Sequence, residues 1–483
     1  MHRGAVGGDG VCDTEAVRDE RPVIRRLAWL TPRRIIFGTL GWLGLFTIGS
    51  IGVANPFEDE RSAAAAINYW HVMYLHGMLI GLVGVTLLLA LSVFNLRWRH
   101  AWLLIPLGVV VATVLATLGG IFDHSIPGSV GDRVATWVQI LGFFTLDEML
   151  VVIGLAFFLD WRAQERLLPR ASFLVAWAAS ISMLIAAIMG HLAGWILEFG
   201  NRPAFIGTYA RLVGESVTTL EGNLVTSHSH EMTVAFMVLV VAASVAYYAE
   251  RSPVDRFERM RSAGLWAALF GIVAFTAVYV WAGFTPWTIP TLFASHHGVN
   301  GLAADDVLTG IAMLGGLLAL SGAFLGGTKK PALPVFAAVW GWLLTILLVV
   351  ATGYWIEFHE THYGAGKPAA GAASDALFTW FHQDVGLFLF PCMTVVMLIT
   401  ARYVLPKHQW RPSLLAVIGS SVLFAGGMVY LFFDHALYGS GYVLSTAGLT
   451  VIGASFLGTI WWGLTSQRPR AGARWDPTSE PAS

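Results

Sequence analysis

The sequence predicts an all-α, polytopic membrane protein, and three observations support this fold class: its composition, its long apolar stretches and the placement of its basic residues. Of the 483 residues, 56% are hydrophobic and 12% are charged, and the mean hydropathy is +0.66. Soluble domains carry about 25% charged residues. The composition therefore excludes a soluble enzyme, a disordered chain and a nucleic-acid binder. Cys12 and Cys392 lie too far apart for a CxxC metal motif, a CxxCH haem attachment or a disulfide framework.

Twelve stretches meet the requirement of about 20 mostly apolar residues for a membrane helix. They run over 35–54, 70–94, 101–122, 134–159, 171–197, 224–248, 265–284, 303–325, 333–356, 377–400, 414–433 and 443–464. We therefore expect a twelve-helix membrane domain over 35–466, between polar cytoplasmic tails at 1–34 and 467–483. The first stretch has no small-residue cleavage pattern, so we interpret it as a retained helix rather than a signal peptide.

The basic residues predict the orientation of these helices. The two tails and the loops on their side hold 24 Lys and Arg, whereas the loops on the other side hold five. Because cytoplasmic loops carry the excess of basic residues, we expect a multi-pass protein of the cell inner membrane with both termini in the cytoplasm. The opposite side is acidic, which indicates either ordinary loop solvation or a docking face for a basic soluble electron donor.

The spacing of similar segments predicts a threefold internal repeat of four helices. His76, His230 and His382 each lie at the start of a span, 154 and 152 residues apart. The ends of the third, seventh and eleventh spans also resemble one another, as GIFDHSIPGS, ASHHGVNG and LFFDHALYGSG. Such a repeat would place the second, sixth and tenth spans around one axis.

Twelve of the 15 histidines lie at or near the outer ends of the expected spans. They are His71, His76, His124, His191, His228, His230, His296, His297, His359, His362, His382 and His435. Ionisable groups at membrane depth are costly and usually functional, and imidazole is the commonest metal ligand. The pattern favours haem or metal ligation over helix capping. A haem with two axial imidazoles needs them from different helices, and His76 and His382 are candidates.

Two local motifs add candidate metal ligands. His296 and His297 are adjacent, after the proline-containing run TPWTIPTLFAS, where irregular backbone would let both bind one ion. His228 and His230 are two residues apart, so on a helix they diverge by about 200°. Either they serve different partners, or one of them only supports a ligand from behind. Glu231 beside them is an oxygen ligand, a proton donor or a charge favoured at the start of a helix.

Three further carboxylates are candidates for proton transfer or for positioning a ligand. Asp147 and Glu148 lie near the middle of the fourth span, where we favour a proton relay over a protonated acid bonded to a neighbouring helix. Asp384 lies two residues after His382 and could bond to a ligand histidine or to the propionate side of a haem.

The chain resembles subunit I of the haem-copper oxidase superfamily in five features taken together. These are the twelve spans, the repeat, the outer histidines, the HH pair after the seventh span, and the histidines of the second, sixth and tenth spans. The stretch GYWIEFHETHYGAG…FTWFHQDVGLFLFPCMTVVMLITARYVLP has the layout of the ninth and tenth helices in its nitric oxide reductase branch. The resemblance covers the layout of the whole membrane region, although strict motif identity is thin.

The resemblance implies a role for each matching residue. His296 and His297, with His228 or His230, would hold a non-haem metal, either copper or iron. His382 would be the axial ligand of the active-site haem, and His76 or His71 would bind a second, low-spin haem. The tenth helix of the family has HxH, whereas this chain has His382-Gln383-Asp384. The oxygen-reducing members have His-x-x-x-Tyr on the sixth helix, whereas Met232 and Val234 occupy the corresponding positions here.

The function that follows is reduction of a small diatomic gas by a haem-containing oxidoreductase, nitric oxide to nitrous oxide being favoured over oxygen to water. Electrons would come from a soluble c-type cytochrome, a cupredoxin or quinol, and other subunits could be present in the lipid membrane. Three alternatives remain open. SHSHEM at 227–232 is similar to the HxHEM signature of NnrS-type haem and copper proteins of nitric oxide stress. The chain could also be a twelve-helix transporter, or a relative that has lost catalysis.

Overall fold

The computed structural model describes residues 31–49, 79–125, 129–163, 170–198, 204–214, 216–249, 257–284, 304–326, 333–363, 380–432 and 438–465. Within these ranges all regular secondary structure is helical, which confirms the all-α class. Ten of the described helices are long and apolar enough to cross a membrane, as expected for a polytopic membrane protein. The first two expected spans overlap the helices α2 (Pro32–Gly49) and Leu79–Val93, which are not among the ten.

The remaining helices follow the expected order along the chain. They are α4 (Ala101–Ser125), α5 (Ser129–Ala163), α6 (Ala171–Glu198), α7 (Ala204–Val213), α8 (Val217–Ala249), α9 (Glu258–Phe284), α10 (Ala304–Gly326), α11 (Leu333–Tyr363), η2 (Trp380–Leu389), α13 (Phe390–Tyr403), α14 (Pro406–Phe432) and α15 (Tyr438–Thr465). Only the short helix α7 lies outside the twelve stretches that hydropathy predicts.

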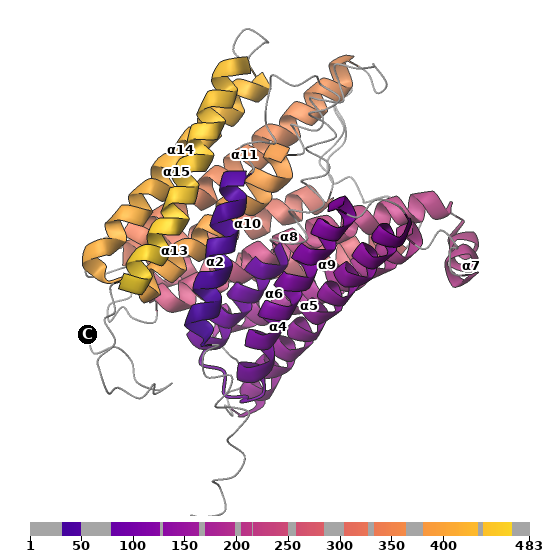
Figure 1. The fold of residues 1–483 in the computed structure, drawn as a ribbon, viewed down its shortest axis with the longest axis horizontal. Helices are drawn as coiled ribbons and strands as arrows, with labels where there is room; N and C mark the ends of the chain where they lie inside the picture. The colour runs from indigo at the N-terminus through magenta and orange to yellow at the C-terminus, as the bar shows by residue number, and fades with distance from the viewer. Residues whose placement is uncertain are drawn as a thin grey trace, which may run out of the picture.

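Consecutive long helices pack as antiparallel pairs, namely α4 with α5, α6 with α8, α9 with α10, and α14 with α15 (Figure 1). Close approach depends on small residues, as is usual where helices pack in lipid. A Cβ atom on Gly264 of α9 would meet the backbone of Gly315 and Ala319 on α10. The α14–α15 pair uses Gly419 and Gly448 in the same way.

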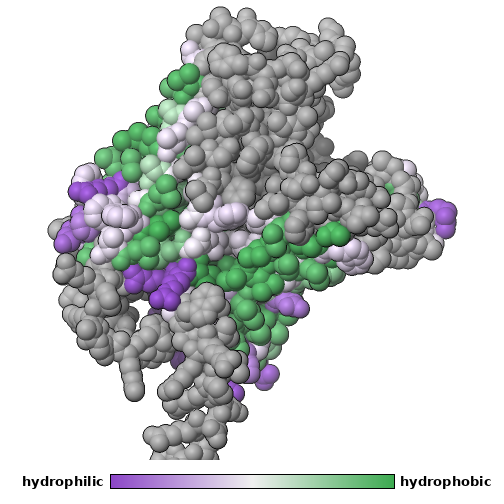
Figure 2. Space-filling view, in the orientation of Figure 1, coloured by the Kyte–Doolittle hydropathy of each residue, from purple (hydrophilic) through white to green (hydrophobic). Residues whose placement is uncertain are grey.

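Two of the long apolar helices form the centre of the bundle. The apolar spans of α8 and α13 are 89% buried, whereas those of the other eight are 39–56% buried. The described part of the face drawn in Figure 2 is mainly hydrophobic or neutral, so apolar side chains cover the outside as well as the core. Because α8 and α13 are surrounded by protein, their polar side chains face other helices rather than lipid.

The helix Leu79–Val93 is also buried along most of its length. At the end of α13, the Arg402 guanidinium donates a hydrogen bond to Ser92 and lies over the ring of Tyr247 from α8, 5.8 Å from its centroid. The Tyr247 hydroxyl donates to the carbonyl of Ala401 over 3.1 Å. The second, sixth and tenth expected spans therefore end side by side. This arrangement is compatible with the predicted threefold repeat, which itself stays a prediction.

Candidate functional site

The described histidines of the outer group share one end of the bundle. His124 and His191 lie near the ends of α4 and α6, His359 and His362 near the end of α11, His228 and His230 in the first half of α8, and His382 in η2. The helices alternate in direction, so these positions fall at the same end. His71, His76, His296, His297 and His435 lie outside the described residues.

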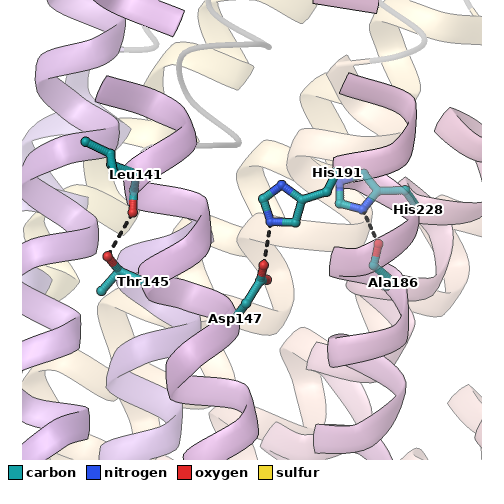
Figure 3. A network of polar contacts seen from close by, with 6 residues as sticks. All are labelled: Leu141, Thr145, Asp147, Ala186, His191 and His228. Carbon is teal, nitrogen blue, oxygen red and sulfur yellow. Dashed lines mark hydrogen bonds and ion pairs between the residues drawn. The ribbon is translucent and has the colours of Figure 1, made fainter. Parts of the chain in front are cut away.

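A carboxylate and two imidazoles line up across α5, α6 and α8 (Figure 3). Asp147 of α5 forms a hydrogen bond and ion pair with Nε2 of His191 on α6. The His191 ring is stacked on Phe144 at 4.7 Å between centroids. His228 of α8 lies close enough to Asp147 and His191 for its charge to interact with theirs. Asp147 and His191 can therefore share a proton, and His228 is a further titratable group beside them.

The His228 ring has a defined tautomer. Its Nδ1 lies 2.7 Å from the carbonyl oxygen of Ala186, and a carbonyl oxygen can only accept a hydrogen bond. Nδ1 therefore carries a proton, which leaves Nε2 as the acceptor of the neutral ring. The absence of a side chain at Gly190 makes room for this ring, because a Cβ atom there would collide with it.

Glu231 lies one turn after His228 and is completely buried. Its Oε1 lies 3.2 Å from the Ser182 hydroxyl of α6. Ser182 also bonds to Thr276 of α9, whose hydroxyl lies 2.9 Å from the carbonyl oxygen of Ile272. The two hydroxyls supply two protons for three hydrogen bonds, so all three form together only when Glu231 supplies the third. Oε2 of Glu231 has no hydrogen-bond partner in the described part of the chain. We therefore expect the neutral acid.

His230 faces a different neighbour from His228. Its ring is stacked on Tyr279 of α9, with centroids 5.9 Å apart and planes 10° from parallel. Tyr279 in turn packs against Phe275 at 4.5 Å. The two rings therefore have different neighbours, in line with their spacing along a helix, and their roles as ligands stay predictions. His230 also lies close enough to His382 of η2 for their charges to interact.

His382 is oriented by α11. Its Nδ1 lies 2.8 Å from the Thr352 hydroxyl, which lies 2.6 Å from the carbonyl oxygen of Leu348. Thr352 has one proton, and the carbonyl takes it, so Nδ1 of His382 is the donor in the contact between them. Any metal bound by this ring would then be ligated through Nε2. His382 lies in a π-helix, a wide form of helix that is frequent at functional sites.

The side chains of Asp147 and Glu148 have different surroundings, and the proton relay expected of them stays a prediction. Asp147 faces His191, whereas Glu148 is exposed on the outer side of α5. Asp384 lies in η2, two residues after His382. Within the described ranges, no three His, Cys, Asp or Glu side chains gather closely enough to hold a metal ion. A ligand set that includes His296 and His297 falls outside those ranges.

Sequence reasoning missed the hydroxyl and aromatic partners of these groups. Ser182, Thr276, Thr352 and Tyr279 are common residue types in apolar helices, and nothing in their spacing distinguishes them. His191 belongs to the outer histidines, but the sequence carries no sign of its pairing with Asp147, 44 residues earlier.

Comparison of the chain with protein-family models, with curated proteins and with solved structures gives no match.

Proposed function

We propose that this protein is a membrane oxidoreductase that uses haem to reduce a small diatomic gas, with nitric oxide favoured over oxygen. One observation carries the proposal: His230 of α8 and His382 of η2, 152 residues apart in the sequence, lie on helical segments that contact each other and are near enough to interact electrostatically. Imidazoles that come together inside a bundle from separate helices are the usual ligand supply for haem and for a second metal.

The described side chains fit one axial haem ligand. His382 would ligate iron through Nε2, and Thr352 fixes its ring by accepting from Nδ1, as partners of metal-bound histidines commonly do. A non-haem copper or iron would take His230 or His228, with His296 and His297 completing the set. Bound haem would supply a site for the gas and a carrier for electrons. A second haem, on His76 or His71, belongs to the same proposal.

Reduction of nitric oxide consumes protons that the chain must deliver. Two molecules of nitric oxide combine with two electrons and two protons to give nitrous oxide and water. Glu231 is placed to hold one proton on its carboxyl group, beside both His228 and His230. Asp147 and His191 form a second group in which Oδ2 and Nε2 can share a proton, and His228 lies beside them. Buried acids and imidazoles of this kind mark proton paths in membrane proteins.

The electron donor would be a soluble c-type cytochrome, a cupredoxin or quinol, because the chain has no CxxCH motif of its own. A soluble donor would dock on the acidic loops opposite the basic side. We place the protein in the cell inner membrane with both termini in the cytoplasm, on the strength of the 24-to-5 distribution of Lys and Arg.

A proton-coupled carrier is the second candidate. The ion pair of Asp147 with His191, inside two spans, is an arrangement that such a carrier would also use. An NnrS-type haem and copper protein would use the same histidine ligands of α8 but would not catalyse reduction of nitric oxide. Measured reduction of nitric oxide by haem-loaded protein separates both from the enzyme.

The decisive experiment compares His382→Ala with His408→Ala. His408 lies in the first turn of α14, at the opposite end of the bundle, stacked on Trp462. We expect purified wild-type protein to show a haem Soret band and bound iron. We expect His382→Ala to lose most of the band of the active-site haem, with His408→Ala unchanged. Wild-type protein without haem or metal would refute the proposal.

A further inference from the structure

Glu148 is an acid on the outside of the bundle at membrane depth. Three acidic residues lie more than one helical turn inside the described apolar spans, namely Asp147, Glu148 and Glu231. Asp147 is paired with His191 and Glu231 is completely buried, whereas the Glu148 side chain is exposed. No hydrogen bond or ion pair joins Glu148 to any residue that the structure describes.

Its depth follows from the packing of α5 on α4. A Cβ atom on Gly108 would contact the side chain of Met149, so Glu148 is level with the middle of the apolar stretch Ala101–Gly119. Along α5 itself, Glu148 is the twelfth residue of the span Trp137–Ala163. Neither helix end is within reach of a glutamate side chain, so this carboxyl group cannot extend to water along α5.

The surface around Glu148 is apolar. The large hydrophobic residues exposed on α5 are Val134, Trp137, Leu141, Phe144, Val151, Leu155 and Leu159, between 42% and 56% exposed. With Glu148 they form one stripe of the helix at steps of three and four residues, which we call the α5 face. Such spacing is that of a surface on which another helix packs.

Other exposed helix faces have the same spacing but no acid. Between its first turn and Trp281, where burial is described, the exposed residues of α9 are Ala263, Trp266, Phe270, Val273, Ala277 and Trp281. The exposed residues of α4 within its apolar stretch are also all hydrophobic. Lipid tails satisfy those two faces. A carboxyl group surrounded by lipid tails has no partner for its polar atoms, so lipid does not satisfy the α5 face.

We propose that the α5 face binds a transmembrane helix of another polypeptide, which places a basic or other hydrogen-bond-donating side chain against Glu148. The occupant follows from complementarity of polar groups, since a carboxyl group in hydrocarbon requires a hydrogen-bonding partner. A second copy of this chain packed through the same face about a two-fold axis would put one acid opposite another. One polar residue in an apolar helix seam also fixes which helix binds and at what height. This proposal is independent of haem and of catalysis.

The test uses the full chain in membranes of its natural source. The photoreactive amino acid p-benzoylphenylalanine is placed at Leu155 on the α5 face or, as the matched control, at Phe270 in the middle of the exposed α9 face. We expect illumination to give a covalent adduct of defined mass from Leu155 and none from Phe270. Mass spectrometry of the adduct should identify a different polypeptide, with a membrane span that carries a donor at the depth of Glu148.

Substitution of Glu148 then decides whether the acid is responsible. Glu148→Leu should remove at least nine-tenths of the adduct, whereas Glu148→Gln, whose amide oxygen still accepts, should keep a substantial part. Removing the donor of the partner should have the same effect as Glu148→Leu, with no further loss when both changes are combined. Adducts with lipid alone, an adduct of twice the mass of this chain, or an adduct insensitive to Glu148→Leu would each overturn the proposal.

Discussion

The single proton of the Thr352 hydroxyl determines which ring nitrogen of His382 carries a hydrogen and which is free to bind a metal. Because the hydroxyl donates to the carbonyl of Leu348, it can only accept from the His382 ring. The sequence predicted His382 as a ligand from its place at the start of a span. It could not predict Thr352, because a threonine in an apolar helix usually bonds only to its own backbone, as Thr345 does with Gly341.

Loss of this contact should weaken haem binding. In Thr352→Val, we expect haem affinity to fall about 10- to 100-fold, as for other residues that orient a metal ligand. Thr345→Val removes a buried hydroxyl of the same helix that does not contact His382, so it should bind haem normally. Transfer of haem from each variant to a competing apoprotein measures the difference. An equal loss of haem affinity in the two variants would mean that Thr352 contributes to the stability of α11 and does not orient His382.

The proton count around Glu231 gives a prediction that needs no turnover. Two hydroxyls and three hydrogen bonds require a protonated carboxyl group on Glu231. The infrared spectrum at neutral pH should therefore contain the carbonyl band of a buried carboxylic acid, and Glu231→Gln should abolish that band. Glu148→Gln is the matched control. A spectrum in which Glu231→Gln removes only a carboxylate band would show that the three hydrogen bonds are not formed together.

At the scale of helices, hydropathy predicted the spans well and their ends less well. The expected stretch 171–197 corresponds to α6 at Ala171–Glu198, but α9 begins seven residues before the expected 265 and includes Glu258, Arg259 and Arg261. Helices continue into the polar interface, where hydropathy no longer reports on them. The short helix α7 was missed because ten residues cannot span a membrane and the prediction sought only spans.

Arg402 connects α13 with α8 and with the helix Leu79–Val93 at the end of the bundle opposite the outer histidines. It bonds to Ser92 and lies over Tyr247 and Tyr403. Arg402→Met should lower the free energy of unfolding by about 1.5–3 kcal/mol, the usual contribution of a charged hydrogen bond. Haem binding should persist, because Tyr247 is 19 residues, or about 28 Å, along α8 from His228.

Thermal unfolding in detergent, followed together with the Soret band, measures both effects. Arg411→Met is the control, since Arg411 lies over the rings of Trp410 and Trp462, on the α14–α15 pair. A stable Arg402→Met variant would show that apolar packing alone holds the central helices together.

For the molecule as a whole, the placement of basic residues predicts sidedness, and the fold allows a direct measurement. Leu212 in α7 is 81% exposed, whereas Thr465 ends α15 at the opposite end of the bundle. In intact cells stripped of any outer envelope, a membrane-impermeant thiol reagent should label Leu212→Cys and leave Thr465→Cys unlabelled until lysis. Both variants carry Cys12→Ser to remove the thiol of the tail. The reverse pattern would invert the orientation and the side from which a donor reaches the protein.

The sequence predicted the fold class of the molecule because lipid imposes helices and apolar length on any chain that crosses it. It predicted less of the site, because contacts such as that between Asp147 and His191 depend on how helices rotate against each other. Rotation is fixed by local details such as Gly190, which admits the ring of His228. Such details do not recur at regular intervals along the chain, so a single sequence shows no pattern from which they could be predicted.

The pairing of α8 with α6 has a consequence for how the chain enters the membrane during synthesis. The neighbours of His228 and Glu231 include Ala186, Gly190 and Ser182, all of which emerge from the ribosome before α8 does. When α8 leaves the translocon, its polar residues meet a surface already shaped for them, before α9 or α13 exists. The polar stretch of α8 can therefore gain its partners on α6 before the second half of the protein has been synthesised.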